Sequence, residues 1–126
     1  MLFRSVKNAA LIASLRQQCG GPRDGALLRF SLGNALLSDG ESDTAIDELQ
    51  RALAFDPAYS AAWKLLGKAS LEAGQLQAAA AAWRSGIAAA AQRGDKQAEK
   101  EMTVFLRRLE KEHLQELVCL PPKKGA

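Results

Sequence analysis

The sequence predicts an all-α protein made of antiparallel helix-turn-helix repeats that stack into a short solenoid, and three observations lead to this prediction. The stretch LGNALLSDG at residues 32–40 returns 34 residues later as LGKASLEAG at residues 66–74. Both copies carry a glycine inside an expected helix, where glycine costs about 1 kcal/mol relative to alanine. Apolar residues around them recur at helical rather than alternating spacing. A period of this length is typical of stacked helix pairs.

The composition fits one domain outside the membrane. Of the 126 residues, 48% are hydrophobic and 25% are charged, which provides enough apolar material for one continuous core. No apolar run approaches the roughly 18 residues that a membrane span requires. The formal net charge is +3, but lysine and arginine are spread among acidic residues, which does not favour nucleic acid as a partner. We therefore expect a soluble, cytoplasmic protein that binds neither membranes nor nucleic acid.

The sequence lacks the groupings of residues that catalysis or metal binding would need. The two cysteines, Cys19 and Cys119, lie far apart without the short spacing of zinc or dithiol sites, and we expect reduced thiols rather than a disulfide. The single histidine, His113, lies among charged residues of an expected helix, as a solvated histidine does. The sequence thus predicts a protein that is not an enzyme and has no metal, no cofactor and no small-molecule substrate.

The repeat can be followed position by position between residues 26–59 and 60–93. The residues that are identical in both copies are leucines and small residues, which fit between two helices that cross closely. These identical pairs are Leu32/Leu66, Gly33/Gly67, Ala35/Ala69, Leu37/Leu71, Gly40/Gly74, Ala45/Ala79 and Ala54/Ala88.

On these residues the chain resembles the tetratricopeptide repeat family over two units, 26–59 and 60–93. The family pattern of a Leu-Gly pair followed by small and bulky positions is met by Leu32, Gly33, Ala45, Leu49, Ala52 and Pro57, and then by Trp63, Leu66, Gly67, Ala79, Trp83 and Gly86. The chain departs from the pattern where Arg29 replaces the usual tryptophan and Ala91 stands where proline is common. It departs again where Leu36 and Ser70 stand at a position that is often tyrosine. The resemblance implies a helical array that binds other proteins.

The helices can be placed from their stop and start signals. We expect helices at about 26–39, 42–55, 58–73 and 76–92, with Asp24 as the first N-cap and Gly40 in the left-handed conformation that ends a helix. The proline at position 57 ends the second helix. Gly33 and Gly67 should mark the closest approach of the paired helices, with Ala45 and Ala79 opposite them.

Both flanks of the repeats are expected to cover the ends of the array. We expect residues 94–117 to form a capping helix with Asp95 as N-cap, and residues 118–126 to form a flexible tail. Residues 1–25 permit a short helix and a linker that pack on the first unit. An alternative is a mitochondrial transit peptide, because the residues before Asp24 are basic and contain no acid.

The resemblance also implies a concave groove lined by the first helix of each unit, suited to a peptide or a partner helix. The candidate binding residues at the family's groove positions are Leu27, Phe30, Asn34, Lys64, Lys68, Leu71 and Glu72. The two lysines would form a basic patch for an acidic segment. Whether Leu27 and Leu71 face the groove or the core stays open at this point.

Three classes of function remain to be compared. The favoured one is an adaptor that binds a peptide or a partner helix, and the alternative is a self-associating assembly protein whose helical faces join its copies. The third class, an enzyme, is disfavoured because the sequence shows no cluster of polar residues of catalytic type. A clamp for chaperone tails is disfavoured, because of the family's five clamp positions only Asn34 matches.

Overall fold

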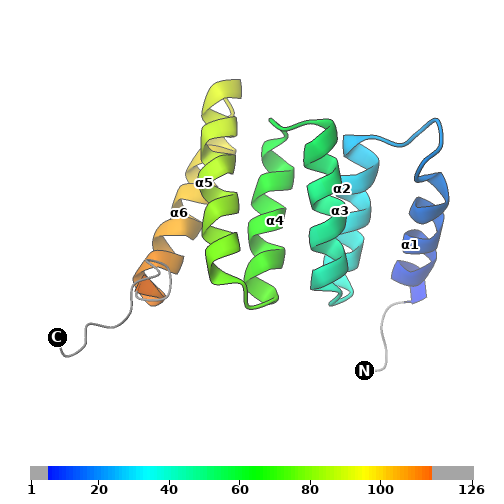
Figure 1. The fold of residues 1–126 in the computed structure, drawn as a ribbon, viewed down its shortest axis with the longest axis horizontal. Helices are drawn as coiled ribbons and strands as arrows, with labels where there is room; N and C mark the ends of the chain where they lie inside the picture. Colours follow the sequence, from blue (N-terminus) through cyan, green and yellow to red (C-terminus); the bar gives the residue numbers. More distant parts are fainter. Residues whose placement is uncertain (1–5, 115–126) are drawn as a thin grey trace.

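The structure is a computed structural model that describes residues 6–114, and these residues form a row of six helices (Figure 1). The all-α prediction is confirmed. Short turns join the helices, so that each one runs antiparallel to the next. In chain order they are α1 (Val6–Gln18), α2 (Ala26–Ser38), α3 (Ser42–Phe55), α4 (Ser60–Glu72), α5 (Leu76–Arg93) and α6 (Lys96–Glu112).

The helices lie in two layers. Each helix packs against its neighbours in the chain, and in addition α2 contacts α4 and α4 contacts α6. Within the described part of the chain, α3 and α5 make no contact with each other. Because α2, α4 and α6 approach one another while α3 and α5 do not, the stack bends toward the side of α2, α4 and α6. We call these three helices the inner layer.

The expected helices agree with the observed ones to within two residues wherever both can be compared. The last helix ends at Glu112, and its expected end at 117, the tail 118–126 and Cys119 lie outside the described residues. The other cysteine, Cys19, is half-buried and donates its thiol to the Leu15 carbonyl oxygen at 3.6 Å. None of the helices described here has the length and apolar character needed to cross a membrane.

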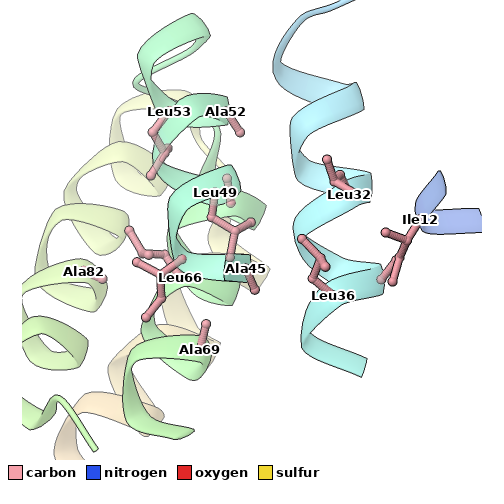
Figure 2. Packing of buried hydrophobic residues seen from close by; sticks show 13 residues of the cluster. Ile12, Leu32, Leu36, Ala45, Leu49, Ala52, Leu53, Leu66, Ala69 and Ala82 are labelled. Carbon is pink, nitrogen blue, oxygen red and sulfur yellow. The ribbon is translucent and has the colours of Figure 1, made fainter. Parts of the chain in front are cut away.

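The core follows the stripe of leucines and alanines that the repeat predicts. Leu32 of α2 and Leu49 of α3 have no exposed surface, and both lie in a cluster that reaches from Ile12 on α1 to Ala82 on α5 (Figure 2). A second cluster surrounds Trp83 and joins α4, α5 and α6. Trp63 packs against both clusters, so the core runs along the array.

The helical glycines lie where paired helices approach most closely, as predicted, but the opposing groups are larger than expected. A Cβ at Gly33 would stand 2.8 Å from Leu49 Cγ and 2.9 Å from Leu49 Cδ2, and the Ala45 carbonyl oxygen follows at 3.4 Å. A Cβ at Gly67 would fall on the indole ring of Trp83. Ala45 lies opposite Gly33 through its backbone, as expected, but the nearest atoms at each glycine belong to the bulky side chain one helical turn further along the partner helix.

Asp24 does not cap α2, contrary to the sequence prediction. The N-cap is Gly25, and no side chain caps this helix. Asp24 instead accepts hydrogen bonds from the Gly20 backbone N–H at 2.8 Å and from the Arg29 guanidinium at 2.8 Å and 2.9 Å. The other caps agree with expectation: Gly40 has φ 83°, and Asp95 accepts a hydrogen bond from the Ala98 backbone N–H at 3.1 Å.

Arg29 occupies the position where the family has tryptophan, and it replaces ring packing with ion pairs. Its guanidinium donates to Asp24 and, at 2.8 Å, to Glu48 of α3. All three side chains are largely buried, with 13%, 13% and 9% of their surface exposed. The arginine thus ties the loop before α2 to α3.

We expect Gly67→Ala to destabilise the protein by roughly 1–3 kcal/mol in urea unfolding, because the added methyl group displaces the rigid indole of Trp83. Gly33→Ala should be milder, since Leu49 can change rotamer and alanine favours the helix. Gly25→Ala is the matched control, because nothing lies within 4 Å of its Cβ position. Equal stability of the Gly67 and Gly25 variants would contradict this packing.

The hydrogen bonds from Arg29 and from the Gly20 N–H lower the pKa of Asp24 from 3.8 to about 2. A carboxyl whose pKa is depressed by folding stabilises the fold above its unfolded pKa and loses that contribution as the pH falls. Stability should therefore decline between about pH 4 and pH 2, and Asp24→Asn should flatten this decline in thermal melts across that range. The exposed Asp47→Asn is the control. An unchanged acid profile in the Asp24 variant would contradict the assignment.

Candidate functional site

The inner layer presents the predicted residues of α2 in two different ways. Leu27 is 69% exposed and Asn34 is also exposed, so no other part of the described chain covers either side chain. Phe30 is half-buried against Tyr59, with ring centroids 5.2 Å apart at an angle of 40°. This tilted ring pair joins α2 to the start of α4. Burial, together with the charge of Asp56, raises the pKa of Tyr59.

Lys64 is not the open cation that the sequence predicts. Its ammonium donates to Glu101 Oε1 on α6 at 2.5 Å, and Gln97 donates to the other oxygen of the same carboxylate at 2.8 Å. The hydrogen bond from Lys64 is the main cause that lowers the pKa of Glu101. The helix α6 continues the inner layer beside α4 and brings this carboxylate to the lysine.

The other predicted residues of α4 are open. Lys68 is exposed, and its ammonium lies 5.2 Å from the centroid of the Phe105 ring, a cation–π contact. Leu71 is 39% exposed, and Glu72 is exposed at the end of the helix. Of the two lysines expected to form a basic patch, Lys68 forms no ion pair with a carboxylate among residues 6–114, although its charge contributes to lowering the pKa of Glu101.

A pocket of about 300 Å³ opens beside these residues, between the C-terminal halves of α4 and α6. We call it the α4–α6 pocket, and α5 supplies part of its wall. Its walls are largely apolar, with charged groups among them. The lining residues are Lys68, Leu71, Trp83, Phe105, Arg108, Leu109 and Glu112.

Sequence reasoning found two of these lining residues, Lys68 and Leu71, and missed the other five. Four of the missed residues belong to α6, which was interpreted only as a cap. The available signal was the spacing of Phe105, Arg108, Leu109 and Glu112, which places them on one side of a helix. Recognising that this side borders α4 required knowing that α6 continues the inner layer.

Metal ions have no evident site in the described residues. No group of three or more His, Cys, Asp or Glu side chains is arranged there to hold one. Charged side chains of the inner layer either form an ion pair, as Lys64 does with Glu101, or lie exposed at the surface, as Lys68 does.

Comparison with known proteins decides the family. The family model of the tetratricopeptide repeat matches residues 26–69. A TPR repeat-containing protein of Pseudomonas aeruginosa is 52% identical over 101 residues, which cover 80% of this chain and 96% of that protein. The chain belongs to the tetratricopeptide repeat family.

Solved structures share the fold of this chain. A protein of Bordetella parapertussis studied in solution is 44% identical, with a TM-score of 0.71 over 90% of this chain and 95% of that one. The crystal structure of the MamA protein has a TM-score of 0.62 over 93% of this chain and 70% of that one, at 21% identity. At that identity the likeness concerns the fold alone.

The pairing of Lys64 with Glu101 across the tetratricopeptide array can be tested by charge reversal. Lys64→Glu places two carboxylates side by side, and we expect a lower melting temperature than in the wild type. The exchanged variant Lys64→Glu with Glu101→Lys should recover most of that loss. Lys100→Glu, a reversal at an exposed position of α6, is the control for net charge. A swap that recovers nothing would contradict the pairing.

Proposed function

We propose that this tetratricopeptide repeat protein is a non-catalytic adaptor whose inner layer binds a peptide or a helix of another protein. The observation that carries the proposal is the exposure of apolar side chains on that layer, Leu27 at 69% and Leu71 at 39%, beside the open polar groups of Asn34 and Lys68. Large apolar side chains that stay exposed beside polar ones favour protein contact. Proteins of this family generally bind other proteins, which also supports an adaptor function.

The chemistry of the inner layer supports binding rather than catalysis. Catalysis would need a nucleophile or an acid–base pair directed into a cleft. Two ionisable groups of the layer, Lys64 and Glu101, neutralise each other. The α4–α6 pocket holds lysine, arginine and glutamate side chains but neither histidine nor cysteine. We therefore propose no substrate and no cofactor.

Self-association is the second candidate, and one observation favours it. Large apolar side chains are also exposed away from the groove positions, as at Leu11 on α1, which is 47% exposed, and Phe55 on α3, which is 54% exposed. They could join copies of the chain through their outer surfaces. A mass that rises with concentration in sedimentation, with Leu11→Lys and Phe55→Lys abolishing the rise, would favour this reading over the adaptor.

The proposed location is the bacterial cytoplasm, since similar proteins come from Pseudomonas aeruginosa and Bordetella parapertussis. With a cytoplasmic location, α1 caps the first repeat unit and is not a targeting segment. The packing of α1 against α2, with Ile12 only 8% exposed, supports a role in covering the first unit.

Affinity purification of the full chain from bacterial extract, followed by mass spectrometry, tests the adaptor. We expect Leu27→Glu with Leu71→Glu to lose specific partners, because both changes place charge on the inner layer. The control is Ala81→Glu with Ala88→Glu, which adds the same charge at exposed positions of α5. Identical partner lists for wild type and the inner-layer variant would contradict the proposal.

A further inference from the structure

We propose that the α4–α6 pocket anchors an acidic peptide: one bulky apolar side chain fills the pocket, and carboxylates beside it pair with Lys68 and Arg108. This inference rests on the proposed function and names the partner chemistry of the same surface. It differs from the sequence prediction, which placed the basic patch at Lys64 and Lys68.

The walls of the pocket are suited to an apolar group. Trp83 and Leu109 are buried, with 2% and 3% of their surface exposed, and Phe105 packs on Trp83 with ring centroids 5.4 Å apart. Leu71 is the open apolar side chain at the edge. An apolar group between these side chains gains dispersion contacts and leaves water. A volume of about 300 Å³ lies at the lower end for ligand sites, which fits a single large side chain.

The charges at the pocket select acidic neighbours for that side chain. Within residues 6–114, neither Lys68 nor Arg108 has a carboxylate at ion-pair distance, whereas Lys64 is held by Glu101. The contact with the Phe105 ring keeps the Lys68 ammonium beside the pocket before any ligand binds. Glu112, the acidic lining residue, offsets one of the two cations. The remaining positive charge attracts carboxylates flanking the anchor.

The charge of the whole chain argues for a different protein as the occupant rather than a second copy. The chain carries a formal net charge of +3, so a second copy would bring a like-charged molecule toward the two cations. An acidic peptide meets the same cations with attraction. Because Lys68 and Leu71 also belong to the open surface of α4, a peptide anchored in the pocket can continue along the inner layer.

A random-peptide phage library selected on the full-length protein tests the inference. We expect a consensus in which a large aromatic or aliphatic residue is flanked by Asp or Glu. The selected peptide is then synthesised with a fluorescent label, and its affinity is measured by anisotropy. Lys68→Glu and Arg108→Glu should each weaken binding by roughly tenfold, and more salt should weaken wild-type binding.

The matched control is Lys100→Glu, which alters net charge equally on α6 but lies outside the pocket. It should bind the peptide as the wild type does, and circular dichroism should show unchanged melting for all three variants.

Peptides whose affinity depends on Leu27 and Asn34 but not on Lys68 or Arg108 would overturn the inference and leave the adaptor function standing. Failure to select any peptide would count against both. Dimerisation that Arg108→Glu abolishes would assign the pocket to a second copy instead.

Discussion

The contact between a bulky side chain and bare helix backbone sets the geometry of the whole array. In the second unit the Trp83 indole lies over Gly67 and donates its N–H to the Lys64 carbonyl oxygen at 3.1 Å. In the first unit Leu49 lies over Gly33 in the same way. A side chain at Gly67 would displace the rigid indole or push the paired helices apart, and the loss of packing would exceed the helix propensity gained, whereas at Gly33 the more flexible Leu49 lowers this cost. The chain therefore has glycine at two positions where an isolated helix would favour alanine.

The inner surface follows from this close packing. Because α4 and α5 are held together by Trp83, α6 can pack on α5 and still reach α4. Asp95 at its start accepts a hydrogen bond from the Ser60 hydroxyl at 2.9 Å, and Glu101 pairs with Lys64 further along. The capping helix thus neutralises one predicted binding residue. It also supplies most of the α4–α6 pocket, so the end of the array contributes binding chemistry as well as covering the core.

The repeat itself was predictable from sequence, whereas the site was predictable only in part. A fixed period, glycine stop signals and apolar spacing are local features, and they gave the helices and the close approach at Gly33 and Gly67. The partner of Lys64 was not predictable, because Glu101 is 37 residues away and belongs to a helix without the Leu-Gly pair. Asp24 was misassigned because an N-cap and an ion-pair partner share the same residue types. Such long-range choices depend on tertiary packing that one sequence does not display.

The most direct test of the close helix contact is the proton NMR spectrum of Gly67 in the full-length protein. Stacking on the Trp83 ring should shift the Gly67 α-protons well away from their random-coil position and give nuclear Overhauser cross-peaks to the indole protons. Random-coil shifts without any cross-peak to Trp83 would show that the helices do not meet at this glycine, and the derived inner surface would then be incorrect.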